Sequence, residues 1–524
     1  MDYLIHHMLR RSAERFPEKE ALVHDDIRLS YADMAESVAG LAHGLREAGL
    51  RRFDRVGILA EPSMAQTQAI LGASQSGGVF VPIHHSLFPE QVAHIIRDCD
   101  MTALVVESTR LNTLAPVLAE CASLEFLVVI GEPVNDVAIT AYAFDQLTRH
   151  VPPAWCDAVV EKDLAAVLYT SGSTGTPKGV MLSHANLTAG ASIVSAYLDI
   201  TDTDRTMAIL PFSFDCGLNQ LMTGLQQGAT IVLTTWLFAK DIVRMLAAER
   251  ITGLAGVPSL WSLLVQPSSR LARTELPHLR YVTNTGGALS DHTLAQLRAS
   301  LPSTDVVLMY GLTEAFRSTY LPPGELVRRG VSMGKAIPDT EILVVNDAGH
   351  RCEPGEVGEL VHHGPTVALG YWGQQELTAA VWRPHPFPAP GLVDVPKVVY
   401  SGDLVRTDEA GFLYFVGRRD NQIKCSGFRI SPTEVEDVLC RSGSVQEAAV
   451  IGVPNAVLGE HIKAFVTPRE GTAVVDIRDL LSFCSARMPR HMVPQSIEVV
   501  VDLPTTPSGK IDYSALRQRD ETLA

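Results

Sequence analysis

Residues Leu168–His184 read LYTSGSTGTPKGVMLSH, and this stretch is the most informative part of the chain. A short apolar run, typical of a buried strand, leads directly into a loop of Gly, Ser and Thr that one lysine, Lys178, closes. Glycine lets a backbone turn tightly and approach a ligand closely. Backbone N–H groups and hydroxyls in such a loop can face an anion. The order of the residues therefore predicts a phosphate site, although the composition alone also fits a flexible polar loop.

The loop differs from the P-loop motif, because Pro177 precedes the lysine and Gly179 follows it. YTSGSTGTPKG instead resembles the signature of the AMP-forming adenylating superfamily, which contains acyl-CoA synthetases, adenylation domains of non-ribosomal peptide synthetases, and luciferases. The resemblance covers essentially the whole chain, because the other motifs of the superfamily follow in order. It implies that the loop binds ATP through Thr170, Ser171, Gly172, Ser173 and Gly175 and catalyses with Thr174 and Lys178.

Short apolar runs alternate with helical patterns around this stretch. Strands are predicted at Val56–Ala60, Ala103–Val106 and Phe126–Ile130, with helices at Ala65–Ser76 and Glu90–Arg97. The alternation predicts an α/β fold, in which a large N-terminal body of mostly parallel sheets is covered by helices on both faces. Ligands of such bodies bind in loops at the carboxyl ends of strands.

The pattern changes after about Pro338, where strands with tight Gly-containing turns are predicted. After Gly417 the predicted pieces form a compact α+β unit of roughly a hundred residues, within the usual range for a domain. We therefore expect two domains, residues 1–417 and residues 418–524. The resemblance implies that the second is mobile and rotates about a hinge at Asp420.

Three motifs resemble the nucleotide site of the superfamily: NTGGALS at Asn284–Ser290, YGLTE at Tyr310–Glu314 and YSGD at Tyr400–Asp403. A glycine turn lets a flat base lie against backbone, and a carboxylate is a strong acceptor for ribose hydroxyls. A glutamate can hold Mg²⁺, which prefers hard oxygen ligands beside phosphates. The resemblance implies that ATP is bound by Gly286, Gly287, Ala288, Tyr310, Gly311, Thr313 and Asp403, and Mg²⁺ by Glu314.

Two later motifs resemble superfamily segments that face the same active site in turn, one in each half-reaction. GRRDNQIKCSGFR at Gly417–Arg429 supplies Arg418 for ribose and phosphate, Lys424 for thioester formation, and Gly427, which leaves room for a pantetheine arm. TTPSGKID at Thr505–Asp512 supplies Lys510, which would reach the reacting carboxylate and the α-phosphate. Without the resemblance, both segments would be interpreted as solvated basic loops.

The identity of the acid is less clearly indicated. SFD at Ser213–Asp215 resembles domains that activate amino acids, in which the aspartate pairs with the substrate ammonium, whereas many acyl-CoA synthetases have a histidine where Phe214 stands. Asp215 could instead cap a helix that starts near Gly217. GLTEAFRSTYLPP at Gly311–Pro323 is similar to stand-alone acyl-CoA ligases. Predicted acyl-pocket residues are Phe212, Phe214, Asp215, Val257 and Pro258, although Phe212, Val257 and Pro258 could equally be core residues.

Composition excludes several classes of protein. The formal net charge of −16 argues against non-specific nucleic-acid binding. No apolar run is long enough to span a bilayer and no signal peptide is evident, and the scattered cysteines argue against disulfide or zinc frameworks, so a cytoplasmic location is expected. The partners implied are ATP, Mg²⁺, a carboxylic or amino acid, and either free CoA or the phosphopantetheine of a separate carrier protein. Alternatives are a ligase whose acceptor is not a thiol, and a nucleotide-binding homologue without catalysis.

Overall fold

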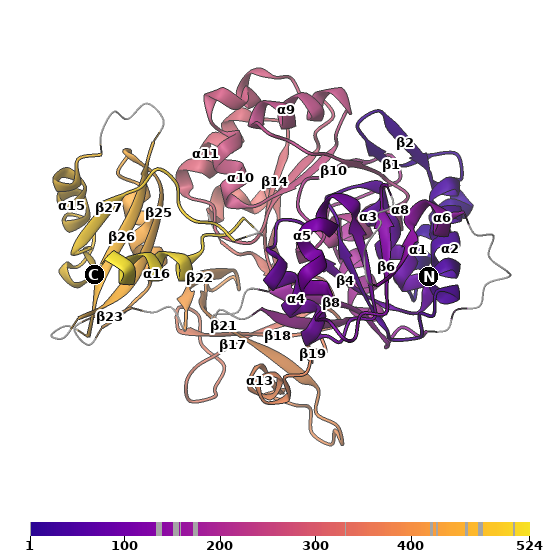
Figure 1. The fold of residues 1–524 in the computed structure, drawn as a ribbon. Helices are drawn as coiled ribbons and strands as arrows, with labels where there is room; N and C mark the ends of the chain where they lie inside the picture. Colours follow the sequence, from indigo (N-terminus) through magenta and orange to yellow (C-terminus); the bar gives the residue numbers. More distant parts are fainter. Residues whose placement is uncertain are drawn as a thin grey trace.

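The computed structural model describes residues 2–132, 139–149, 157, 159–170, 177–330, 332–419, 423–425, 428–455, 459–469, 475–506 and 509–523. Figure 1 shows a large body that carries the N-terminus and a smaller unit that carries the C-terminus. The described chain forms two large sheets and two smaller ones, and most neighbouring strands of the large sheets run parallel. The α/β class predicted from the alternating pattern is therefore confirmed.

The first large sheet carries the predicted phosphate loop. In spatial order its strands are β19 (Gly370–Tyr371), β9 (Lys178–Ser183), β8 (Leu164–Thr170), β4 (Val79–Ile83), β3 (Arg55–Leu59), β5 (Ala103–Glu107), β6 (Phe126–Ile130) and β7 (Thr140–Ala143). β8 and β9 pair antiparallel, and Thr170 lies opposite Lys178 in this pairing. The two ends of the loop are therefore held side by side.

The second large sheet carries the strands that precede most of the predicted nucleotide and acid segments. In spatial order its strands are β16 (Lys335–Ala336), β15 (Thr319–Leu321), β14 (Asp305–Tyr310), β13 (Tyr281–Asn284), β12 (Gly253–Gly256), β10 (Arg205–Ala208), β11 (Thr230–Leu233), β1 (Glu20–His24) and β2 (Ile27–Ser30). β14, β13, β12, β10 and β11 are mutually parallel, so their carboxyl ends meet at one edge.

Helices lie between the two sheets and on their outer faces. The middle layer contains α1 (Ile5–Arg15), α2 (Tyr31–Glu47), α3 (Met64–Ser76), α6 (Phe144–Thr148), α7 (His184–Tyr197) and α8 (Asp215–Gln227), which share one apolar core with both sheets. α7 and α8 bury residues on nearly every side, as expected of helices inside a core. The outer layers contain α4 (Pro89–Asp98) and α5 (Ser108–Leu118) on the first sheet, and α9 (Ala239–Ala248), α10 (Pro258–Leu264) and α11 (Asp291–Ser300) on the second.

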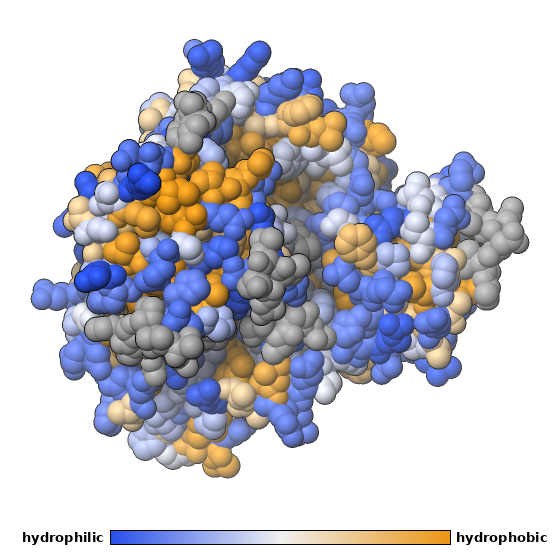
Figure 2. Space-filling model, turned by 60° about the vertical axis from the view of Figure 1, so that its left-hand side comes forward, coloured by the Kyte–Doolittle hydropathy of each residue, from blue (hydrophilic) through white to orange (hydrophobic). Residues whose placement is uncertain are grey.

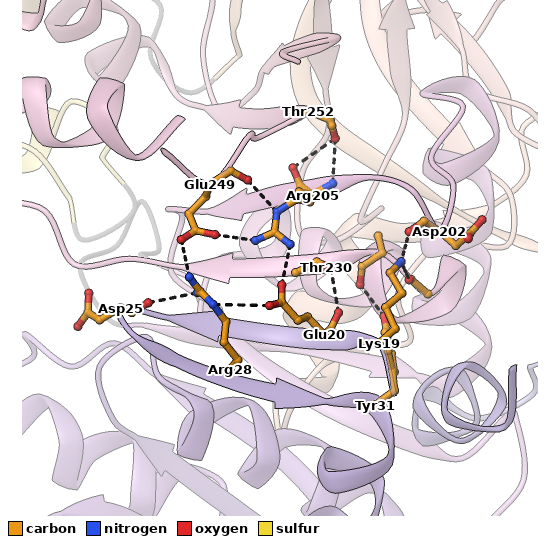
Figure 3. Close-up of polar contacts among 12 residues, drawn as sticks. Lys19, Glu20, Asp25, Arg28, Tyr31, Asp202, Arg205, Thr230, Glu249 and Thr252 are labelled. Atoms are coloured by element: carbon orange, nitrogen blue, oxygen red, sulfur yellow. Dashed lines mark hydrogen bonds and ion pairs between the residues drawn. The ribbon is translucent and has the colours of Figure 1, made fainter. Parts of the chain in front are cut away.

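Ion pairs join the N-terminal hairpin, β1 and β2, to residues of the neighbouring part of the second sheet (Figure 3). Arg205 Nη1 lies 2.8 Å from Glu20 Oε2, and Arg205 Nη2 lies 2.6 Å from Glu249 Oε2. Arg28 Nη2 lies 2.8 Å from Glu249 Oε1. Because these groups are partly solvated, each pair adds little to stability. Their main effect is to hold the hairpin in register beside β11, with which β1 pairs in parallel.

The third sheet is the last part of the large body in the sequence. It contains β17 (Glu341–Val345), β18 (Val357–His363), β20 (Trp382–Pro384), β21 (Lys397–Thr407) and β22 (Leu413–Arg418), with short helices α12 (Leu326–Arg329) and α13 (Gln375–Val381) nearby in sequence. The YSGD motif lies inside β21, where Gly402 has a φ of +73°. The backbone therefore changes direction within a strand at this motif.

The last sheet has an apolar core of its own. It contains β23 (Ile423–Cys425), β24 (Phe428–Ile430), β25 (Val445–Asn455), β26 (Gly459–Pro468) and β27 (Ser496–Val499). α14 (Pro432–Cys440) and α15 (Ile477–Ser485) pack on one face, and α16 (Tyr513–Leu523) packs on the other. The last strand of the third sheet ends at Arg418, and the next described strand begins at Ile423 in this separate sheet.

Most of the molecular face in Figure 2 is polar, with apolar side chains gathered in smaller patches, and the surface is hollowed between a larger and a smaller lobe. Among the described residues, no helix combines the length and the apolar character that crossing a membrane requires.

Glu436 on α14 makes the stability of the C-terminal unit depend on pH. Its Oε1 accepts hydrogen bonds from the Val450 N–H at 2.8 Å and the Tyr513 hydroxyl at 2.9 Å. Burial raises the pKa of this carboxyl from 4.5 to about 7. Between these values the folded state binds more protons than the unfolded state, so stability falls as pH rises through this window.

We expect Glu436→Gln to raise the free energy of unfolding by about 1–2 kcal/mol at about pH 8, because it removes a buried charge. At about pH 4 both folded and unfolded carboxyls are protonated, and the gain should vanish. Chemical denaturation at the two pH values measures this, with the exposed Glu409→Gln as the control. An equal effect of Glu436→Gln at both pH values would contradict the raised pKa.

Candidate active site

The candidate site lies where the parallel strands of the second sheet end. β10 is followed by Phe214 and Asp215, β12 by Val257, β13 by Gly286 and β14 by the YGLTE motif. Since neighbouring parallel strands end at the same edge, the loops that follow them meet. Four predicted site segments that lie far apart in the sequence are therefore brought to one edge.

Lys510 of the C-terminal unit reaches this edge. A Cβ placed on Gly286 would lie 3.2 Å from Lys510 Cε, 3.3 Å from Val257 Cγ1 and 3.6 Å from Phe214 Cζ. Lys510 Nζ lies 5.7 Å from the centroid of the Phe214 ring. Gly286 also has a φ of +80°, which disfavours any side chain. Glycine at this position is therefore what lets the lysine approach the large body.

Hydrogen bonds hold the loop that carries Lys510, one from the large body and one within the loop itself. The Ser259 hydroxyl of α10 donates to the Gly509 carbonyl at 3.0 Å. Within the loop, the Thr506 N–H donates to the Lys510 carbonyl at 2.7 Å. A second contact between the two units joins Arg441 Nη2 of α14 to Asp291 Oδ2 of α11 at 3.1 Å. Lys510 is thus held against the carboxyl edge of the second sheet.

Tyr310, Asp403 and Arg418 form a second cluster. The buried Asp403 carboxylate accepts a short hydrogen bond from the Tyr310 hydroxyl, and its Oδ1 lies 3.1 Å from Arg418 Nη1. Burial raises the pKa of Tyr310, and Asp403 raises it further, so the phenol stays a donor. The ring of Tyr310 stacks on His362 with centroids 6.0 Å apart. The cluster combines an aromatic plane, a carboxylate and a guanidinium, which are the groups that recognise a nucleoside phosphate.

Glu314 lies beside the ends of the phosphate loop. Its Oε1 accepts a hydrogen bond from the Tyr371 hydroxyl at 2.7 Å. Lys178 Nζ lies 5.7 Å from the centroid of the same ring, so one aromatic side chain separates the two charges. The carboxylate is only partly buried, which keeps it accessible to a ligand. A hard oxygen donor next to a phosphate loop fits Mg²⁺.

Asp215 occupies the first turn of α8 and is 5% exposed. Its Oδ1 accepts a hydrogen bond from the Cys216 N–H at 2.8 Å. The alternative that Asp215 caps a helix starting near Gly217 is wrong, because α8 begins at Asp215 itself and its N-cap is Phe214. Phe212 is fully buried in the main core, which agrees with the alternative that it is a core residue. Val257 and Phe214 lie next to Lys510, as described above, and the ring of Pro258 lies near Gly287.

Several predicted residues fall outside the part of the chain that the structure describes. They are Ser171, Gly172, Ser173, Thr174, Gly175, Asp420 and Gly427. Lys424 lies in β23, but the described structure does not extend to its side chain. The roles given to these residues stay predictions.

Sequence reasoning missed four residues that the structure brings to the site: His362, Tyr371, Ser259 and Arg317. His362 supports Tyr310, Tyr371 orients Glu314 and Ser259 holds the Lys510 loop. Arg317 is buried three positions beyond the YGLTE motif. His362, Tyr371 and Ser259 lie outside the quoted motifs, and Arg317 lies within Gly311–Pro323, where nothing in the local sequence distinguishes it from a solvated arginine.

Comparisons with known proteins agree with this geometry. Residues 9–372 match the family model of the AMP-binding enzyme, and residues 434–510 match that of the AMP-binding enzyme C-terminal domain. A feruloyl-CoA synthase from Amycolatopsis is 32% identical over 518 residues, which are 97% of each chain. One of the linear gramicidin synthase proteins of Brevibacillus parabrevis is 30% identical over 98% of this chain, which spans only 10% of that protein.

Solved structures show the same fold over the whole length. An anthranilate CoA ligase in complex with anthranoyl-AMP superposes with a TM-score of 0.89 at 26% identity and covers 98% of this chain and 97% of its own. ATP-bound MatB from Rhodopseudomonas palustris gives a TM-score of 0.87 at 25% identity and full coverage of both chains. The chain belongs to the family of AMP-binding enzymes, the adenylate-forming ligases that activate a carboxylic acid.

Proposed function

We propose that this protein uses ATP to convert an amino or imino acid into an acyl-adenylate, releases pyrophosphate, and transfers the acyl group to a phosphopantetheine thiol. The observation that carries the proposal is the position of Lys510 against Gly286, Val257 and Phe214, at the edge where the nucleotide and acid loops meet. A lysine held there can neutralise charge between a carboxylate and a phosphate.

The first half-reaction is an in-line attack of a carboxylate oxygen on the α-phosphorus of ATP, with pyrophosphate as the leaving group. Two anions must approach each other, so charge neutralisation and alignment account for most of the catalysis. In our proposal Lys510 binds the carboxylate and the α-phosphate, and Lys178 binds the leaving phosphates. Mg²⁺ held by Glu314 would neutralise phosphate charge when bound. No protein nucleophile is needed.

The nucleoside would be held by the Tyr310, Asp403 and Arg418 cluster. We propose that Asp403 accepts hydrogen bonds from the ribose hydroxyls and that Arg418 contacts ribose or phosphate. Tyr310 would stack on the adenine with His362 on its other side. The glycine loop at 286–288 would receive the edge of the base. These assignments are supported by the geometry of the cluster and by the family of the chain.

In the second half-reaction the thiol attacks the acyl carbon and AMP leaves. We propose that the C-terminal unit, residues 418–524, rotates about Asp420 so that Lys424 and Gly427 replace Lys510 at the site. The acceptor is free CoA or a carrier protein. The relatives support both choices, because one is named a feruloyl-CoA synthase and another a linear gramicidin synthase.

An amino acid is our first choice of substrate because Asp215 is a buried carboxylate at the edge of the acid site. A buried carboxylate needs a cationic partner, and a substrate ammonium can provide one. The second candidate is an aryl or fatty acid, which the feruloyl-CoA synthase and anthranilate CoA ligase relatives favour. In that case Asp215 would serve only the first turn of α8, through its bond to the Cys216 N–H.

Lys510→Ala is expected to reduce adenylate formation at least about a hundredfold, because an electrostatic contact made in the transition state is lost. Lys424→Ala should leave adenylate formation intact and slow thioester formation. Pyrophosphate exchange measures the first step, and mass spectrometry of the acylated thiol measures the second. Lys162→Ala, an exposed lysine before β8, is the control. Equal losses in both steps for both variants would contradict the exchange of lysines.

Asp403→Asn is expected to raise the KM for ATP by about ten- to a hundredfold, because hydrogen bonds to a charged acceptor contribute roughly 1.5–3 kcal/mol. The KM for the acid should change little, since Asp403 belongs to the nucleotide cluster. Pyrophosphate exchange at varied ATP concentration measures this, and the exposed Asp25→Asn serves as the control. A larger effect on the acid than on ATP would contradict the assignment.

Exchange across a panel of free acids tests the substrate class. We expect a response to amino acids, and Asp215→Asn should lower kcat/KM for them at least tenfold, because the partner of the ammonium loses its charge. A response confined to aryl or fatty acids that Asp215→Asn leaves unchanged would establish the second candidate instead.

A further inference from the structure

In the part of the chain that the structure describes, two groups of histidine and carboxylate side chains bring their ligand atoms within 4.8 Å of one another. The N-terminal group contains His6 and His7 of α1 together with Asp157, which precedes β8. The third-sheet group consists of Glu341, His363 and His385. Imidazole nitrogen and carboxylate oxygen are both ligands of Zn²⁺. The hydrogen bonds of each group decide whether its nitrogens are available to a metal ion.

The third-sheet group is unsuited to a metal ion because the tautomer of His385 is fixed. The Phe387 N–H donates to His385 Nδ1 at 3.0 Å. A backbone N–H can only donate, so Nδ1 carries no proton and the neutral ring carries its proton on Nε2. This Nε2 lies 3.0 Å from Glu341 Oε2 and donates to it. A metal at Nε2 would move the proton to Nδ1, where it would face the Phe387 N–H.

The N-terminal group has no such conflict. His6 Nδ1 lies 3.0 Å from the Ser74 hydroxyl of α3. A hydroxyl can accept as well as donate, so Nδ1 can carry the proton and leave the lone pair of Nε2 free for a metal. Metal-bound histidines usually donate their other N–H to a fixed acceptor in this way. Burial lowers the pKa of His6, so its imidazole is neutral at neutral pH.

Both histidines converge on one carboxylate. His6 Nε2 lies 3.0 Å from Asp157 Oδ1, and His7 Nε2 lies 2.9 Å from Asp157 Oδ2. Ligand atoms around a tetrahedral Zn²⁺ with bonds of about 2.0–2.1 Å are separated by roughly 3.3 Å, so only small shifts would admit the ion. The hydrogen bond from His6 holds the pKa of Asp157 well below its usual range, and the carboxylate is therefore ionised. His7 and Asp157 are partly exposed, which gives an ion access.

Arg10 competes with a metal ion for this carboxylate. Its Nη1 lies 3.7 Å from Asp157 Oδ2, and half of its side chain is exposed. A solvated ion pair of this kind contributes little stability, so the arginine can turn into solvent when a cation binds. The two imidazoles and the carboxylate then supply three ligands, and water can take the fourth position.

We propose that His6, His7 and Asp157 bind one divalent transition-metal ion, Zn²⁺ by preference, and that the ion ties α1 to the segment before β8. Imidazole ligands disfavour Mg²⁺ and Ca²⁺, which prefer oxygen. The site uses no cysteine, and 150 residues separate His7 from Asp157, so only the fold assembles it. The proposal is independent of the proposed adenylation, because none of these three residues belongs to the candidate active site.

Calorimetric titration of the untagged, EDTA-treated full chain with ZnCl₂ tests this proposal. We expect one equivalent to bind tightly. Ser74→Ala should weaken binding about ten- to a hundredfold, because His6 loses the acceptor of its other N–H. His7→Gln and Asp157→Asn each remove a ligand, so each should weaken binding by more than about a hundredfold. Arg10→Gln should strengthen binding, because it removes the competing charge.

His363→Gln in the third-sheet group is the matched control and should leave Zn²⁺ binding unchanged. Thermal denaturation gives a second readout: an ion bound only by the folded state should raise the Tm of the wild type and of His363→Gln, but not that of His7→Gln or Asp157→Asn. Should the loss of a ligand prevent folding, Ser74→Ala and Arg10→Gln keep all three ligands and decide by opposite changes in affinity. Unchanged affinity in the ligand variants, or no saturable binding by the wild type, would overturn the proposal.

Discussion

The parallel alignment of β10, β12, β13 and β14 is the constraint on which the rest of the site depends. Parallel strands place their carboxyl ends together, so a loop after each strand can contribute to one site. The alignment in turn depends on α7 and α8, which are buried on nearly all sides between the two large sheets. A change in the volume of that middle layer would shift the strands and every loop that follows them.

The contact between Lys510 and the large body depends on two glycines that leave room for the lysine. Gly286 and Gly509 both have a positive φ and no side chain, so the two backbones approach closely. Polar contacts between the C-terminal unit and the large body include the hydrogen bond from Ser259 to the Gly509 carbonyl and the exposed ion pair between Arg441 and Asp291. Exposed ion pairs contribute little stability. Such a contact is compatible with the rotation that we propose for the C-terminal unit.

The proposed acid site differs in its side-chain contacts from the proposed nucleotide site. In the proposed nucleotide site, Tyr310 and Arg418 both contact the Asp403 carboxylate. By contrast, Arg317 and Asn219 line a small cavity next to Cys216, and Arg317 Nε and Asn219 Nδ2 lack hydrogen-bond partners within the described chain. A protein seldom leaves buried donors unsatisfied without a reason, because each costs roughly 1–3 kcal/mol.

The sequence alone determined the family, the α/β class and the short motifs. Each motif is a short run of consecutive residues that directly follows or lies within a predicted strand, so it can be recognised without the tertiary structure. It also predicted many of the strands and helices closely, because their apolar periodicity is local. Only the tertiary structure decided that Lys510 lies against Gly286, that Tyr310 rests on His362 and that Arg317 is buried beside Asp215. These contacts join residues that are distant in the chain, and burial depends on what packs around a side chain rather than on its neighbours in sequence.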